Sequence, residues 1–358
     1  MRDAGYDGEL TLVGDEQHAA YSRPALSKAL LRDELTAHEL PPPTHGATEH
    51  RGMRALGLDP ERRRVLLHGG ESLPYDGLVV ASGCRARRLG RPGEHDDVLS
   101  LRSLDDAWRL RSRLADRPSV VVVGDGPLGM EIASGCLAAG CEVTLVSQGR
   151  PLALQLGAFL SDGVVSAARA RGLRVVTTAE AGLGTSDGRS HVVLADGTRL
   201  EAELVVTAVG DLPNVEWLAR SGLLRQGRLE VDTRGRVRPD VVAAGDVAAV
   251  PTPFGVRRVP LWNSAIEQGK VAATALVHGD AVEPSESRPY FWTEQFGITL
   301  KAVGHLPLDG TPEVVDGDVA DLSAVLRWGG PHPAAVALNV RMPIPRLRRL
   351  CEEPAAAR

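Results

Sequence analysis

The stretch that most constrains this chain is residues 120–131, which reads VVVVGDGPLGME. Four successive valines are typical of a strand buried on both faces of a parallel sheet. Gly124, Gly126 and Gly129 follow at the spacing G-x-G-x-x-G. These glycines allow a tight turn, a close approach of the backbone to a pyrophosphate, and close packing of the next helix on the sheet. An ordinary turn with incidental glycines is the alternative.

The residues after this loop complete a βαβ unit, which favours dinucleotide binding over that alternative. We predict a helix over residues 128–139 that ends at Gly140, and a strand over residues 141–147. An acid is expected near the end of this strand, where it would hold the 2′-hydroxyl of NAD, but Ser147 stands there instead. Arg150 follows, and an arginine can suit a 2′-phosphate, so the sequence leaves NADH and NADPH both open.

Length and composition limit the possibilities further. The chain has 358 residues, enough for two or three domains. Its net charge of -5 gives no general reason for binding nucleic acid or an anionic membrane. We find no signal peptide or long apolar run and expect a cytoplasmic protein. No spacing of cysteines and histidines predicts a metal site.

Cys136 and Cys141 form a C-x4-C pair, a spacing that suggests a redox disulfide. Cys136 falls within the predicted helix, however, and Cys141 opens the strand after it. We therefore interpret both as small buried residues that pack the helix on the sheet.

The first residues enter a βαβ unit partway through. Residues 2–4 resemble the end of a helix that Gly5 stops, and residues 9–13 a strand. Asp15 follows where a doubly wound sheet places an acid on the adenosine ribose, although Asp15 taken alone is better explained as a turn former. We expect a short helix around Lys28, starting at Ser27 or the turn before it. We expect residues 41–52, rich in proline, glycine and polar residues, to be a loop.

Several segments resemble the FAD-dependent ferredoxin reductases of the rubredoxin and putidaredoxin reductase type. They are GDEQHAAYSRPALSK at residues 14–28, LPYDGLVVASG at residues 73–83, RPDVVAAGDVAAVP at residues 238–251 and PYFWTEQFGITLKAVG at residues 289–304. The resemblance covers nearly the whole chain, with its motifs in the expected order.

The resemblance implies two sets of cofactor-binding residues. Lys28 is implied as the catalytic residue, beside the flavin, where it would stabilise negative charge during reduction. The implied FAD-binding residues are Asp15, Arg23, Lys28, Ala55, Ala81, Gly83, Arg102, Asp246 and Trp262. The implied NAD(P)H-binding residues are Gly124, Gly126, Leu128, Gly129, Glu131, Ser147, Arg150 and Gly210. Trp292 and Phe296 either screen the flavin ring from water or belong to an aromatic core.

We therefore predict an α/β fold with two dinucleotide-binding Rossmann-like domains and a small α+β C-terminal domain. We expect the FAD-binding domain at residues 1–102 and 226–284, the NAD(P)H-binding domain at residues 103–225, and a C-terminal reductase or interface domain at residues 285–358. Members of this family begin with a strand, a glycine loop and a helix, roughly 25 residues that are missing here. We expect the first domain to be N-terminally incomplete for this reason and the working protein to be longer.

The implied function is that of a flavoprotein oxidoreductase. It would pass a hydride from NAD(P)H to FAD and then single electrons to a small iron-sulfur ferredoxin or similar carrier, which could feed an oxygenase. An arginine cluster at residues 85–91 is either a solvated loop or a patch that guides an acidic partner. The alternative function is a flavin-deficient, catalytically decayed NAD(P)H-binding module. Four features favour this alternative: the missing first unit, the short segment 41–52, Ser147, and Pro260, which stands where relatives carry a glutamate.

Overall fold

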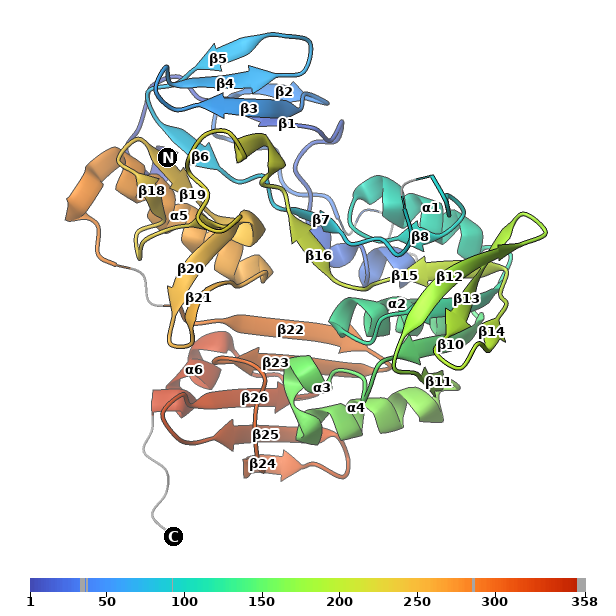
Figure 1. The fold of residues 1–358 in the computed structure, drawn as a ribbon. Coiled ribbons are helices and arrows are strands. Elements are labelled where there is room, and N and C mark those ends of the chain that lie inside the picture. Colours follow the sequence, from blue (N-terminus) through green and yellow to red (C-terminus); the bar gives the residue numbers. More distant parts are fainter. Residues whose placement is uncertain (33–35, 37, 92, 285–286, 353–358) are drawn as a thin grey trace. The chain divides into compact units, whose positions relative to one another are not determined.

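The computed structural model describes residues 1–32, 36, 38–91, 93–284 and 287–352 (Figure 1). They form two compact units, each assembled from three segments of the chain. The first unit takes Met1–Tyr21, Leu40–Arg85 and Leu212–Pro289, and the second takes Ser22–Glu39, Ala86–Asp211 and Tyr290–Arg358. The predicted start of a C-terminal domain at residue 285 lies outside the described residues. In the described part of the chain no helix has the length and apolar character needed to cross a membrane.

The second unit contains the glycine motif in a five-stranded parallel sheet with the order β11-β10-β9-β15-β8. The strands are β8 (Leu99–Ser100), β9 (Ser119–Val123), β10 (Glu142–Ser147), β11 (Arg174–Thr177) and β15 (Leu204–Thr207). The helices of this part are α1 (Leu104–Leu114), α2 (Pro127–Ala138), α3 (Ala153–Leu156) and α4 (Ala158–Ala170). The strand, loop, helix and strand predicted from residues 120–147 are confirmed, with bounds that differ by one residue.

The valine run is buried on both faces of this sheet, which explains why its hydrophobicity does not alternate. Val121 and Val123 pack against Val192 and Leu194 of a three-stranded antiparallel sheet. That sheet consists of β12 (Ala181–Ser186), β13 (Arg189–Leu194) and β14 (Arg199–Leu200). β13 and β14 are antiparallel neighbours on either side of the Asp196-Gly197 turn.

The C-terminal part of the second unit is an antiparallel sheet with the order β22-β23-β26-β25-β24. Its strands are β22 (Tyr290–Gln295), β23 (Ile298–Val303), β24 (Glu313–Asp318), β25 (Ser323–Trp328) and β26 (Ala334–Leu338), and helix α6 (Ile344–Glu352) follows. Leu347 of α6 is fully buried among Tyr290, Val303 and Val325. The buried face of α6 therefore closes the core of this sheet.

The first unit is built from short strands and one long helix. β6 (Leu78–Val80) pairs in parallel with β19 (Val241–Ala243), which also pairs with β18 (Arg236–Arg238). β3 (Ala55–Asp59), β4 (Arg64–Leu67) and β5 (Ser72–Pro74) form an antiparallel sheet. A mixed sheet consists of β17 (Leu229–Glu230), β20 (Ala248–Thr252) and β21 (Gly255–Arg258), in which β20 pairs in parallel with β17 and antiparallel with β21. Helix α5 (Trp262–His278) is the long helix. The chain crosses between the units within β7 (Cys84–Ala86) and β16 (Asp211–Pro213).

Two local predictions are wrong. Residues 41–52 are not all loop, because Thr48–Arg51 form β2, which pairs in parallel with β1 (Thr11–Gly14). This pairing satisfies backbone groups of β1 that a loop would leave open, and it outweighs the polar composition of the segment. The short helix expected around Lys28 is replaced by two 3-10 turns, Arg23–Ala25 and Ala29–Arg32, because the Ser27 hydroxyl donates to Glu131 instead of capping a helix.

Candidate nucleotide and electron-transfer site

The glycine loop of the second unit has the geometry of an anion cradle. Gly124 has φ +119°, and a side chain there would overlap the carbonyl oxygen of Ala208. A side chain on buried Gly129 would overlap the carbonyl oxygen of Gly124. Gly126 is the N-cap of α2 and has no side chain to cap the first amides of the helix. Backbone contacts thus require two of these glycines, and the open helix start fits the pyrophosphate of a dinucleotide.

Ser147 lies at the end of β10, beside this loop. Its side chain is only 1% exposed, and its hydroxyl oxygen is 2.7 Å from Oδ2 of Asp125 and 2.5 Å from the carbonyl oxygen of Gly149. Arg150 is more than half exposed, and its guanidinium lies 3.1 Å from Asp162 of α4. The end of β10 therefore carries a carboxylate, contributed by the glycine loop.

The remaining residues expected on the NAD(P)H side lie on α2 and after β15. Leu128 is in the first turn of α2 and partly exposed, whereas Glu131, one turn later, is buried. Gly210 follows β15 with φ +97°, and its carbonyl oxygen accepts a hydrogen bond of 2.9 Å from the amide of Arg87. Only glycine adopts this conformation easily, and it leaves the backbone uncovered by a side chain.

The structure brings Lys28 and Glu131 together in a buried ion pair. Nζ of Lys28 is 2.8 Å from Oε2 of Glu131, and the two side chains are 11% and 5% exposed. The same carboxylate accepts hydrogen bonds from the hydroxyls of Ser27 and Thr293, the second at 2.6 Å. Nζ of Lys28 also lies 5.4 Å from the ring centroid of Trp292, within the range of a cation–π contact. One face of α2 therefore holds a cation in a fixed, largely dehydrated position.

Arg23 and Arg102, both expected near FAD, are also brought together in the second unit. A guanidinium nitrogen of Arg23 donates to the carbonyl oxygen of Arg102 at 3.0 Å. The amide of Arg102 donates to Asp106, whose side chain also completes the capping box of α1 with Ser103. The N-terminal cap of α1 thus fixes the backbone that orients Arg23.

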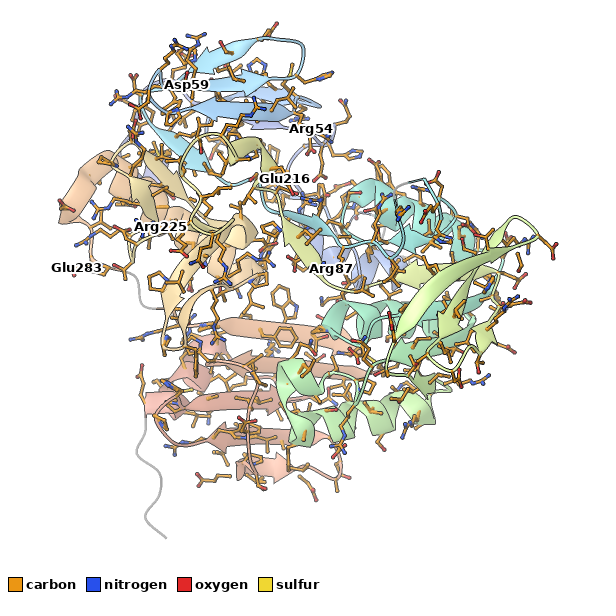
Figure 2. All side chains as sticks on the ribbon, in the orientation of Figure 1. Arg54, Asp59, Arg87, Glu216, Arg225 and Glu283 are labelled. Carbon is orange, nitrogen blue, oxygen red and sulfur yellow. The ribbon has the colours of Figure 1, made fainter. Side chains whose placement is uncertain are left out.

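In the first unit, Asp15 follows the carboxyl end of β1. Its carboxylate is 3.5 Å from the guanidinium of Arg54, a residue labelled in Figure 2. Both side chains are more than half exposed. Ala55, the next residue, begins β3 and is partly buried. The accessible carboxylate of Asp15 has the chemistry to accept from ribose hydroxyls.

Four further residues expected on the flavin side also lie in the first unit. Exposed Ala81 follows β6, and Gly83, with φ +65°, accepts a hydrogen bond from the amide of Asn214. Asp246 lies in the turn after β19, 3.2 Å from the thiol of Cys84, and Trp262 is the first residue of α5. An uncovered glycine backbone and two carboxylates, which accept hydrogen bonds at the ends of strands, form a set of groups that fits a flavin dinucleotide.

Cys136 and Cys141 are both buried, free thiols, which confirms their interpretation as packing residues. Burial raises the pKa of Cys136 to about 12, and burial also raises the pKa of Cys141. Because the thiolate is the reactive form, neither thiol is suited to redox exchange near neutral pH.

Sequence reasoning missed several residues of these sites. Ser27 and Thr293 lie 104 and 162 positions from Glu131 in the sequence, so no local sequence pattern indicates their contacts with it. Asp125 does carry a signal, since it is a charged residue inside a glycine loop. Its relation to Ser147 required the structure.

Comparison with known proteins adds to this geometry. Residues 1–269 match the model of the pyridine nucleotide-disulphide oxidoreductase family. The ferredoxin–NAD(+) reductase component of the p-cumate 2,3-dioxygenase system of Pseudomonas putida is 33% identical over 313 residues, which are 85% of this chain and 77% of that protein. The putidaredoxin reductase of Pseudomonas putida is 31% identical over 322 residues, with 85% and 76% covered.

Two solved structures extend the likeness to the whole fold. The ferredoxin reductase of the CYP199A2 system from Rhodopseudomonas palustris is 32% identical, with a TM-score of 0.85 over 94% of this chain and 86% of that one. Putidaredoxin reductase in its covalent complex with putidaredoxin is 28% identical, with a TM-score of 0.86 over 98% of this chain and 88% of that one.

Proposed function

This chain belongs to the pyridine nucleotide-disulphide oxidoreductase family, and from that membership we propose that it is a FAD-dependent NAD(P)H:ferredoxin oxidoreductase. Its relatives include reductase components of dioxygenase systems, which supports a small iron-sulfur ferredoxin as the acceptor and an oxygenase downstream. The observation that carries the proposal is the buried Lys28–Glu131 pair, because it joins a residue of the expected flavin side to the helix of the glycine loop.

The residues of the chain have distinct tasks in this proposal. When bound, NAD(P)H supplies a hydride and FAD accepts it and releases single electrons. Lys28 provides a positive charge that favours electron transfer toward the flavin side, and Glu131 fixes the position of that charge. Asp15 and Asp246 would hold the flavin dinucleotide by accepting hydrogen bonds from its hydroxyls, and the amides at the start of α2 would hold the pyrophosphate of the reductant.

We also propose how these tasks are divided along the chain. Residues 1–102 and 226–284 bind FAD, residues 103–225 bind NAD(P)H, and residues 285–358 form the part that faces the acceptor. The two buried free thiols, Cys136 and Cys141, are compatible with a reducing compartment, and the cytosol is the location we propose.

An anaerobic titration tests the function. Purified chain incubated with FAD should retain the visible absorption bands of protein-bound oxidised flavin after gel filtration. NADH or NADPH should bleach these bands, and an added [2Fe–2S] ferredoxin should restore them while it becomes reduced. A protein that retains no flavin, or flavin that no reduced nicotinamide bleaches, would contradict the proposal.

A matched pair of lysine substitutions tests the task of Lys28. We expect Lys28→Met to slow the bleaching step by roughly tenfold or more, since it removes a fixed charge near the reacting groups. Lys270→Met removes an exposed lysine from α5 and should leave the rate unchanged. Equal rates in both variants would remove Lys28 from the mechanism.

A further inference from the structure

The reductant-binding loop contains a carboxylate in an unusual place. Strand β10 ends in Ser147, about 20 residues after the glycine loop, where dinucleotide-binding folds commonly place an acid for the 2′-hydroxyl of NAD. Ser147 is 1% exposed and has little surface for a ligand. Asp125 is partly exposed, and its Oδ2 lies 2.7 Å from the hydroxyl oxygen of Ser147.

The backbone around Asp125 is fixed on both sides. The carbonyl oxygen of Asp125 accepts a hydrogen bond of 2.8 Å from the amide of Leu152, and the amide of Gly124 donates to the carbonyl oxygen of Val146 at 3.0 Å. Strands β9 and β10 are neighbours in the sheet, with Val123 opposite Val146. The loop and the strand end therefore lie at one edge of the sheet, and the carboxylate has a defined position there.

The carboxylate of Asp125 keeps room for a ligand. A carboxylate has about four acceptor positions, and a serine hydroxyl has one proton, which Asp125 shares with the carbonyl oxygen of Gly149. Among the described residues, Ser147 is the one hydrogen-bond partner of this side chain. At least two acceptor positions thus remain for the paired hydroxyls of a ribose.

The charges around the end of β10 disfavour a phosphate. Arg150, three residues after Ser147, has a charge that could attract a phosphate, but its guanidinium is paired with Asp162 at 3.1 Å. Asp125, Arg150 and Asp162 together carry a net charge of about -1 at neutral pH. A 2′-phosphate brought to this edge would meet that net negative charge, with a carboxylate as the group fixed closest to the strand end.

We propose that Asp125, positioned by Ser147, replaces the acid missing from the end of β10. Its carboxylate accepts hydrogen bonds from the adenosine ribose hydroxyls of the reductant and repels a 2′-phosphate, so that the chain selects NADH over NADPH. The inference rests on the proposed function, since it names the electron donor of the same oxidoreductase. It adds the residue pair that selects this donor. Asp125 is the specificity-determining residue and Ser147 a positioning residue.

The experiment measures binding without any electron transfer. ADP-ribose and 2′-phospho-ADP-ribose, which lack the nicotinamide ring, are titrated into the purified full chain by calorimetry. We expect the wild type to bind ADP-ribose at least about tenfold more tightly. Asp125→Asn, which keeps the size of the side chain and removes its charge, should lower that preference roughly fivefold or more.

Two further variants separate charge and position from nonspecific effects. Ser147→Ala leaves both aspartates in place and should weaken ADP-ribose binding by about threefold to tenfold, with little effect on the phosphorylated ligand. Asp116→Asn changes the net charge by the same amount at an exposed position ahead of β9 and should leave the ratio unchanged. Circular dichroism and the Tm establish that each variant is folded, and Ser147→Ala decides the question if Asp125→Asn does not fold.

The outcomes are distinguishable. If ADP-ribose binds but the preference is the same in Asp125→Asn and the wild type, the inference fails while flavin bleaching by reduced nicotinamide still supports the proposed function. A wild-type preference for 2′-phospho-ADP-ribose overturns the inference as well. If neither ligand binds and neither reduced nicotinamide bleaches the flavin, both the inference and the proposed function are wrong.

Discussion

Replacing Lys28 by methionine is the sharpest test of how the second unit is held together. Methionine keeps the length of the side chain and much of its volume while it removes the charge. Glu131 would then remain 5% exposed, with the hydroxyls of Ser27 and Thr293 as hydrogen-bond donors but, within the described part of the chain, without an ion-pair partner. We therefore expect a loss of stability that goes beyond the loss of a surface contact.

The distance in the ion pair sets the scale of this loss. Two unit charges 2.8 Å apart attract each other by about 6 kcal/mol at an effective dielectric constant of about 20. Desolvation offsets part of this attraction, and breaking a buried pair from one side costs about 3–5 kcal/mol. Since two hydroxyls still bind the carboxylate, we expect Lys28→Met to cost about 3 kcal/mol, at the lower end of that range.

Urea denaturation followed by tryptophan fluorescence measures the change, with a midpoint shift at constant m-value as the sign of altered stability. Glu131→Gln and the double variant complete a double-mutant cycle, for which we expect a coupling free energy of about 1–3 kcal/mol. Lys270→Met is the control, because this lysine is exposed, and it should change stability by no more than about 0.5 kcal/mol. A Lys28→Met midpoint equal to that of the control, or a coupling of zero, would refute the buried ion pair.

Two further predictions concern glycine packing and buried thiols. Gly129→Ala should destabilise the chain by at least about 2 kcal/mol and abolish ADP-ribose binding, because the new methyl group overlaps the carbonyl oxygen of Gly124. Gly149→Ala is the control: the space around its Cβ position is open, so thermal unfolding should show no change in stability. Cys136 and Cys141 should resist iodoacetamide at pH 8 in the native chain and react after unfolding, and mass spectrometry showing native labelling or a disulfide between them would contradict this. The pKa of Cys136 is higher in the folded chain than in the unfolded chain. Its thiol therefore contributes stability below the unfolded pKa, and this contribution is lost as pH rises toward about 12. Cys136→Ala should weaken the fall of stability with pH above about 9.

The parts of the fold that could be predicted are those whose signals are local. β9, α2 and β10 follow from a valine run, three glycines and a change of period within about 30 residues, so their bounds were accurate to one residue. β2 could not be predicted, because the sequence TEHR has no apolar alternation and becomes a strand only through its pairing with β1. Its backbone partners, and not its side chains, determine its conformation.

In the candidate site, too, the residues with local sequence signals could be predicted and those joined by distant contacts could not. The glycine loop was visible because a backbone conformation demands particular residues at fixed spacing. The Lys28–Glu131 pair joins residues 103 positions apart, and only the family resemblance pointed to either residue. Asp125 was visible as a charge within the loop, but its direction depends on the hydroxyl of Ser147, which lies on the next strand.

Helix α2 connects these parts within the second unit. Its first residues follow the glycine loop, and Glu131 on its second turn binds Lys28. Ser134 accepts a hydrogen bond of 2.7 Å from the amide of Phe296, in the turn that joins β22 to β23 of the C-terminal sheet. The close contact at Gly129 sets how near this helix lies to β9. A larger residue at position 129 would displace the helix as a whole, because its hydrogen-bonded turns move together. The same change should therefore disturb the cradle for the reductant and the position of the Lys28 charge, so the tight packing at Gly129 is what keeps these two parts of the site in a fixed relation.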